Sequence, residues 1–176
     1  QCSSTMRPAF SIRQSPASDY ASLSRWSVEA PQEFWAAVWR FCGIVADERS
    51  GRDPWDRVLL GAGRVAPPTP EEGPRWFEGA RLNFAENLIR RRDQGSAIVF
   101  WNETGRQRSV SFAELAVDVA RIAEGLRESG VGPGDRVAGF MPNVPETVVA
   151  MLAATSIGAI WSSCSPDFGV NGVFDR

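Results

Sequence analysis

The order of hydrophobic periodicities in the second half of the chain constrains the fold most strongly. Two segments with strand-like periodicity, residues 97–101 and 106–110, flank a turn and predict a β-hairpin. Helical and strand-like segments then alternate with short connections: a helix ending before Gly130, a strand at 136–141, a helix at 145–157 and a strand at 159–162. Strands that alternate with helices are typical of parallel sheets. The order therefore predicts an α/β fold containing half of a doubly wound sheet.

The helix that follows the hairpin is the best specified by its sequence. Ser111 and Glu114 match the S-x-x-E capping box, and Val110 and Leu115 stand where a hydrophobic staple needs them. Apolar residues recur at spacings of about 4, 3 and 4, which predicts one buried face comprising Leu115, Val119, Ile122 and Leu126.

Two more helices are expected upstream. One begins at Pro31, because proline suits the first helical position, and ends at Gly43. The other covers residues 82–92, with three arginines at 90–92 in its last turn, where the helix dipole favours cations. Its expected apolar face comprises Leu82, Ala85, Leu88 and Ile89.

The segment 50–79, between these helices, is rich in proline, glycine and aromatic residues. This composition predicts irregular backbone that is anchored by aromatic side chains and wraps a neighbouring surface. Four tryptophans are expected to pack in the core or at a domain seam: Trp35, Trp39, Trp55 and Trp76.

All 19 basic residues are arginine, and the chain has no histidine. Within these residues, this excludes a Schiff-base or P-loop lysine, a histidine general base, a Ser-His or Cys-His pair, and a zinc site that needs imidazole. A net charge of -2 gives no electrostatic reason to expect nucleic acid or an anionic membrane as partner.

Cysteine usage and hydropathy bear on the compartment. The 3 cysteines are far apart and form no C-x-x-C motif, so we expect a reducing compartment and a cytoplasmic location. The longest apolar stretch, 147–161, is too short to span a bilayer and contains polar residues. It predicts a buried helix that runs into a strand, with no transmembrane segment.

Two glycine clusters suggest nucleotide loops but fail the test of context. The cluster at 130–134 follows a helix and precedes a strand, the reverse of the order that holds a pyrophosphate. The cluster at 61–63 follows an apolar run, but Pro67 and Pro68 exclude the helix that should come next. We expect neither loop to contact phosphate.

Other polar clusters are weaker candidates. Arg81 and the run 90–92 carry charge that suits a phosphate, but a solvated helix end is the favoured interpretation. Cys164 lies among serines, yet no histidine exists to activate it. Sites in parallel sheets lie beyond the carboxyl ends of the strands, which places an approaching ligand at residues 163–169.

The ends of the chain resemble cuts. The sequence begins with Gln and stops at Arg176 without a helix stop, so we expect it to be part of a longer protein. Residues 1–20, rich in serine with two arginines, are expected to be a disordered polar tail, with a transit-peptide remnant as the alternative.

Several segments, in the same order along the chain, resemble one family. The segment GPGDRVAGFMPNVPETVVAMLAATSIGAIWSSCSPDFG is similar to an early segment of the adenylate-forming acyl-CoA synthetases, and SFAEL resembles their T-Y-x-E-L helix start. Upstream, WSVEAPQEFWAAVWRFCGI and WFEGARLNFAENLIRR resemble the N-terminal region of the acetyl-CoA synthetase branch, and WSSCSPDFG is most similar to its acetoacetate-activating members. The resemblance covers about residues 19–176.

This resemblance implies a domain organisation. After the tail at 1–20, residues 21–95 would be the wrapping segment of the acetyl-CoA synthetase type. Residues 96–176 would be the truncated start of the AMP-binding domain. The whole would form the N-terminal part of the large domain of an adenylate-forming enzyme.

It also implies an acid–thiol ligase. Such an enzyme transfers AMP from Mg-ATP onto acetoacetate, releases pyrophosphate, and passes the acyl group to the thiol of coenzyme A. Acetate, propionate or another short acyl acid is the alternative substrate. ATP, Mg²⁺ and coenzyme A would serve the intact enzyme, together with the remainder of its polypeptide, whereas none is expected to bind tightly to these residues alone.

The resemblance assigns few site residues. The family's phosphate loop, ribose-binding aspartate and catalytic lysine lie beyond the last residue of this chain, so no catalytic or metal-binding residue is expected in it. Ser165, Pro166 and Asp167 align with a turn near the coenzyme A tunnel and would line it. A truncated, non-catalytic scaffold or partner-binding module is the alternative function.

Overall fold

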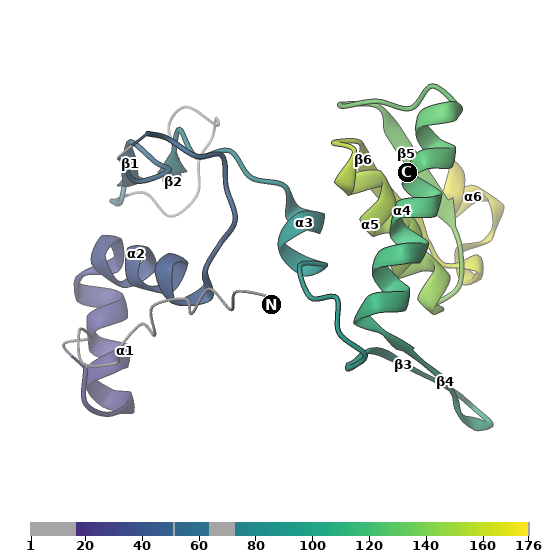
Figure 1. Ribbon diagram of the computed structural model, residues 1–176, viewed down its shortest axis with the longest axis horizontal. Coiled ribbons are helices and arrows are strands. Elements are labelled where there is room, and N and C mark those ends of the chain that lie inside the picture. The colour runs from purple at the N-terminus through teal and green to yellow at the C-terminus, as the bar shows by residue number, and fades with distance from the viewer. Residues whose placement is uncertain (1–16, 51, 64–72, 176) are drawn as a thin grey trace, which may run out of the picture. The chain divides into compact units, whose positions relative to one another are not determined.

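The structure is a computed structural model that describes residues 17–50, 52–63 and 73–175 (Figure 1). Its chain divides into two compact units, Gln1–Leu82 and Asn83–Arg176. Each unit has its own core, and each is described by itself. Among the described residues, no helix is both long and apolar enough to cross a membrane.

The first unit consists of two helices and a small sheet. Its elements are α1 (Tyr20–Glu29), α2 (Pro31–Cys42), β1 (Arg57–Leu60) and β2 (Arg75–Glu78). Helix α2 begins at Pro31 and ends at Gly43, whose φ of 57° is left-handed, so both predicted ends are confirmed. Helix α1 was not predicted; Asp19 and Ser22 form its capping box. Residues 1–16 of the predicted tail lie outside the described residues.

The prediction of irregular backbone over 50–79 is wrong in part. Strands β1 and β2 pair antiparallel, with Leu59 opposite Trp76. Each strand has 4 residues, which is too short to show a clear alternation in the sequence.

Aromatic rings form the core of this unit. Trp39 and Trp55 are buried and contact each other, with ring centroids 5.0 Å apart, and the Phe77 ring contacts both, at 4.5 Å from Trp39 and 5.1 Å from Trp55. The core prediction is therefore confirmed for these two tryptophans. Trp35 and Trp76 contact each other but are exposed in this unit, so seam packing stays a prediction for them.

The second unit contains the elements that the sequence orders most clearly. It comprises α3 (Phe84–Leu88), β3 (Ser96–Asn102), β4 (Gly105–Ser111), α4 (Phe112–Glu128), β5 (Arg136–Phe140), α5 (Pro145–Ser156), β6 (Ile160–Cys164), the 3₁₀ helix η2 (Pro166–Phe168) and α6 (Gly169–Phe174). Strands β3 and β4 form the predicted hairpin, and β5 and β6 pair in parallel from Arg136 opposite Ile160 to Phe140 opposite Cys164. The α/β fold and the helix–strand alternation are confirmed.

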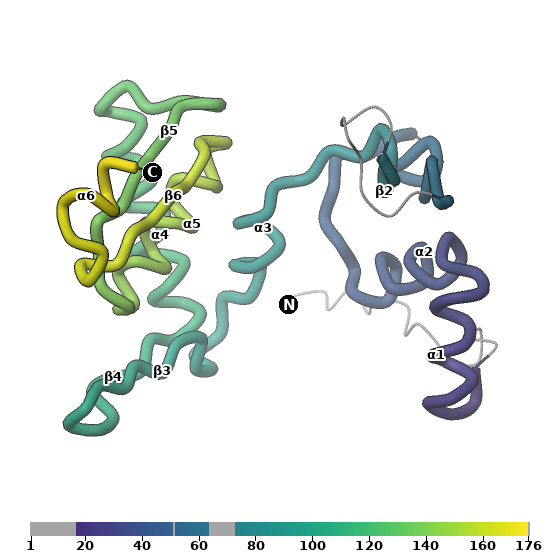
Figure 2. The backbone as a smooth tube through the Cα atoms, turned by 180° about the vertical axis from the view of Figure 1, so that it is seen from behind, coloured from purple at the N-terminus to yellow at the C-terminus, as the bar shows by residue number. Residues whose placement is uncertain are grey.

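Helices α4 and α5 pack together against one face of β5 and β6 (Figures 1 and 2). The capping box of Ser111 and Glu114 is present at the start of α4. The buried face of α4 comprises Leu115, Val119 and Ala123, whereas Ile122 is exposed. Leu126 packs against the core as predicted, so the predicted face is wrong only at Ile122, because the contact with α5 follows residues four apart.

The helix predicted at 82–92 is shorter in the structure. Asn83 caps it and it ends at Leu88, so the arginines at 90–92 follow the helix rather than forming its last turn. Leu82 and Leu88 are about half exposed. Ala85 and Ile89 alone of the predicted face are buried, because one turn of helix presents only a narrow stripe to the core.

Candidate functional site

The carboxyl ends of β5 and β6 lie at one edge of the parallel sheet. The strands end in register, and the Met141 N–H donates to the Cys164 carbonyl oxygen at 3.1 Å. The chain leaves this edge in turns at 141–144 and 165–168. Since ligands of open parallel sheets bind beyond these ends, this edge is the candidate site.

The three predicted lining residues form one turn at this edge. Ser165 caps η2, and its hydroxyl donates to Asp167 Oδ2 at 2.8 Å while the Asp167 N–H donates to Ser165 Oγ at 3.4 Å. Pro166 starts η2 at a position where its missing N–H needs no partner. Ser165 is half-buried, whereas Pro166 and Asp167 face solvent. The turn thus presents a compact, accessible surface with a carboxylate.

Arg108 and Glu146 form an ion pair beside the same edge. Glu146 lies in the first turn of α5, after the turn that follows β5, and Arg108 comes from β4. The hydrogen bond from its own backbone N–H lowers the pKa of the Glu146 carboxyl, partial burial opposes this, and Arg108 lowers the pKa further. Sequence reasoning missed this pair, because 38 residues separate its members and leave no local pattern.

A hollow of about 350 Å³ adjoins this ion pair, between β4, α4 and α5. Its apolar lining includes Val110, Ile122, Met141, Val149 and Ala150. Its charged residues are matched, since Arg108 pairs with Glu146, and Arg121 with Asp118 at 3.4 Å. Balanced charges give the hollow no preference for a charged ligand.

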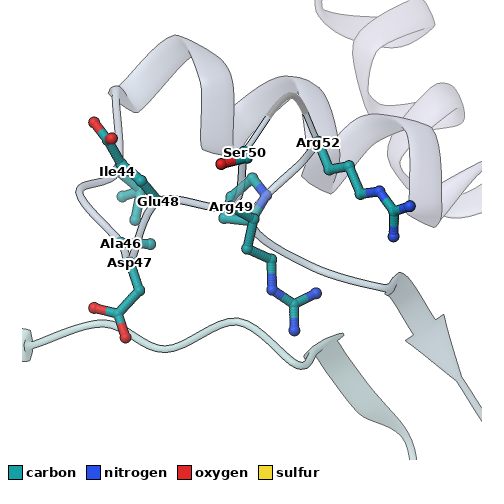
Figure 3. Close-up of a pocket in the computed structure, with 8 residues that line it drawn as sticks. Ile44, Ala46, Asp47, Glu48, Arg49, Ser50 and Arg52 are labelled. Atoms are coloured by element: carbon teal, nitrogen blue, oxygen red, sulfur yellow. The ribbon is translucent and has the colours of Figure 1, made fainter.

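The first unit has a separate hollow of about 460 Å³ in the loop after α2 (Figure 3). It is lined by Ile44, Ala46, Asp47, Glu48, Arg49, Ser50, Arg52 and Pro54. Arg49 pairs with Asp56 at 2.7 Å and Asp47 with Arg81 at 3.8 Å, so two of its charged side chains already have protein partners. No sequence motif pointed to this loop, and we assign it no ligand.

The glycine clusters lie in the context that the sequence predicts. Residues 130–134 join α4 to β5 at the amino end of that strand, opposite to the candidate edge. Gly61 has a φ of 70° directly after β1. Pro67 and Pro68 lie outside the described residues, so the exclusion of a helix after Gly63 stays a prediction.

The arginines near α3 have structural partners. Arg91 pairs with Asp93 at 2.9 Å, and its guanidinium carbon lies 4.0 Å from the centroid of the Phe112 ring. The hydrogen bond from Arg91 lowers the pKa of the Asp93 carboxyl. Arg92 donates to the Arg91 carbonyl oxygen. These contacts hold the loop before β3 and give no separate evidence of a phosphate site.

Cys164 is half-buried at the end of β6, beside the candidate turn. Within the ranges that the structure describes, no group of three or more His, Cys, Asp or Glu side chains is arranged to hold a metal ion.

Two family models match the chain. The AMP-binding enzyme model matches residues 85–173, and the acetyl-coenzyme A synthetase N-terminus model matches residues 20–88. The chain belongs to the AMP-binding enzyme family.

Within this family, the chain is similar to acetoacetyl-CoA synthetases. It is 45% identical over 160 residues to the protein from Danio rerio, covering 90% of this chain and 22% of the relative. It is 44% identical over 158 residues to that from Rhizobium meliloti (strain 1021), with the same coverage. The solved acetoacetyl-CoA synthetase from Streptomyces lividans is 41% identical and superposes with a TM-score of 0.76, covering 91% of this chain and 23% of the other.

These matches confirm the resemblance and the fold that the sequence predicts, namely the N-terminal part of an adenylate-forming enzyme. The chain spans about 22% of the length of the relatives that it matches.

Proposed function

We propose that this chain is the N-terminal part of an ATP-dependent acid–thiol ligase that activates acetoacetate and transfers it to coenzyme A. The observation that carries the proposal is the agreement of the AMP-binding family match with the identity to acetoacetyl-CoA synthetases over 90% of the chain. Acetate and propionate are the competing acids.

The chemistry explains the need for nucleotide and thiol. A carboxylate resists attack because its charge is delocalised and its oxygen leaves poorly. Transfer of AMP from ATP, with release of pyrophosphate, converts that oxygen into a good leaving group that the coenzyme A thiol displaces. Mg²⁺ would neutralise phosphate charge in the first step.

The turn at Ser165, Pro166 and Asp167 is proposed to line the path of coenzyme A. It is exposed at the carboxyl edge of the sheet, and its carboxylate can accept hydrogen bonds from amide N–H groups. The same negative charge disfavours phosphate. The turn therefore suits the amide-bearing arm of coenzyme A rather than its phosphates.

The remaining chemistry is proposed to come from elsewhere in the enzyme. The chain has no lysine or histidine to move a proton, and Arg81 and Arg91, which could counter phosphate charge, form ion pairs with aspartates. We therefore assign it no catalytic or metal-binding residue, and its main partner would be the remainder of its own polypeptide.

A cytoplasmic location is part of the proposal. Cys42 and Cys164 are free thiols in the structure, as is usual for proteins of reducing compartments.

The coding sequence beyond the Arg176 codon tests the proposal. We expect an in-frame continuation that includes a lysine-containing phosphate loop, and a product that releases pyrophosphate with ATP, acetoacetate and coenzyme A faster than with acetate or propionate. A stop codon at that point would favour a non-catalytic module, and a preference for acetate would overturn the assignment of the acid.

A further inference from the structure

Asn83 lies between the short helix α3 and the last turn of α5. Its Nδ2 donates to the carbonyl oxygens of Thr155 and Ser156, both at 3.1 Å. Its Oδ1 accepts from the Glu86 N–H at 3.0 Å. One partly buried side chain therefore caps the start of one helix and the end of another.

The nitrogen and the oxygen of the Asn83 side-chain amide make hydrogen bonds of opposite direction. The Glu86 N–H requires an acceptor, and the two carbonyl oxygens require donors, so only an amide of this length satisfies both sides. Carbonyls in the last turn of a helix lack helical partners and need others. An aspartate would keep the first bond but place an oxygen against two oxygens.

The end of α5 in turn sets the start of β6. The Thr155 carbonyl also accepts from the Gly158 N–H at 3.1 Å, and the Ala159 N–H donates to Ala154. Gly158 has a φ of 81°, and a Cβ there would lie 3.2 Å from Pro133. The chain thus enters β6 through a turn with little freedom, and Asn83 holds the carbonyl from which that turn begins.

We infer that Asn83 is a positioning residue that fixes the end of α5 and the entry into β6. Residue 83 falls in the acetyl-coenzyme A synthetase N-terminus match but lies in the second compact unit, so the end of that region is part of the AMP-binding fold. Strand β6 leads to the Ser165–Asp167 turn. Only this last link, from β6 to coenzyme A, rests on the proposed function.

Thermal unfolding of the 176-residue chain tests the amide requirement. Asn83→Asp should lower the unfolding midpoint at pH 7 by about 4–8 °C. The two carbonyl oxygens favour the protonated form of the new carboxyl, which can donate to one of them, against the opposing effect of the Glu86 N–H, so the loss should shrink at pH 4.5. The matched control is Asn102→Asp. The Asn102 side chain accepts hydrogen bonds at Oδ1, from Thr104 and Gln107, and an aspartate keeps these bonds. The midpoint should therefore stay within about 1–2 °C at both pH values.

Amide hydrogen exchange tests the place of the effect. Asn83→Ser is a milder variant, because serine keeps an acceptor for the Glu86 N–H but is too short to reach the two carbonyl oxygens. Both Asn83→Asp and Asn83→Ser should speed amide exchange at Gly158 and Ala159 by about tenfold. Exchange in the β3–β4 hairpin should change less. A loss for Asn83→Asp that is equal at both pH values, or equal acceleration in turn and hairpin, would overturn the inference. None of these readouts involves coenzyme A, so they stand apart from the proposed function.

Discussion

At the scale of single residues, Gly139 is a position of β5 that has no room for a side chain. A Cβ at this position would lie 2.5 Å from the Trp161 ring on β6. Gly139→Ala should therefore lower the free energy of unfolding by about 1–3 kcal/mol, measured by urea denaturation. The matched control is Gly125→Ala in α4, where a Cβ would meet nothing within 4 Å, and stability should rise by about 0.5–1 kcal/mol. A gain for both variants would show that the strands are not closely packed at Trp161.

Asp167 carries the proposed contact with coenzyme A. In an intact ligase with this segment, Asp167→Ala removes the carboxylate that accepts from Ser165, and the KM for coenzyme A should rise about fivefold. The KM values for ATP and acetoacetate should not change. Asp175→Ala, the same loss of charge at the end of α6, is the control. An unchanged KM for coenzyme A in Asp167→Ala would remove the lining role.

At the scale of elements, the capping box of α4 makes a pH-dependent contribution to stability. The Ser111 N–H and hydroxyl donate to Glu114 at 2.8 and 2.7 Å and lower the pKa of that carboxyl from its usual 4.5. Because the folded-state pKa is the lower one, the stabilisation is present above about pH 4.5 and is lost as the pH falls through the folded value.

Two substitutions separate the parts of this box. Ser111→Ala should cost about 1–2 kcal/mol of unfolding free energy, followed by circular dichroism in denaturant. Glu114→Gln should flatten the pH dependence between pH 5 and 3 relative to the parent chain. An unaltered pH profile in Glu114→Gln would mean that other carboxylates dominate acid unfolding.

Local signals explain which elements the sequence predicts. The ends of α4 and α5 follow from Ser111, Pro145 and the glycines after each helix, because caps act over three or four residues. The location of the candidate site, beyond the carboxyl ends of β5 and β6, follows from the order of strands and helices alone. The pairing of β1 with β2 and the ion pair of Arg108 with Glu146 join residues that are far apart in the chain. Hydrophobic periodicity is a local signal and therefore cannot predict either of them.

At the scale of the whole chain, the face of β5 and β6 away from α4 and α5 lacks a cover among the described residues. On this face Phe140 is 58% exposed and Ile160 is 53% exposed. In the described structure, neither β5 nor β6 pairs with a further strand on its outer side. Parallel sheets are usually covered on both faces. We therefore expect the isolated chain to self-associate.

Sedimentation velocity measures this association. Phe140→Ser combined with Ile160→Thr should reduce it, whereas Val117→Thr, at an exposed apolar residue of α4, should not. A parent chain that sediments as a monomer over the same concentration range would contradict the expectation.

The central claim is that these residues supply the N-terminal part of an acetoacetate-activating ligase. The most direct measurement is pyrophosphate release by a hybrid in which residues 17–175 replace the matching segment of the Streptomyces lividans enzyme. We predict release that requires both ATP and acetoacetate, with formation of acetoacetyl-CoA, and none from the 176-residue chain alone. A hybrid that unfolds cooperatively yet shows no acetoacetate-dependent release, or turnover by the isolated chain, would contradict the account.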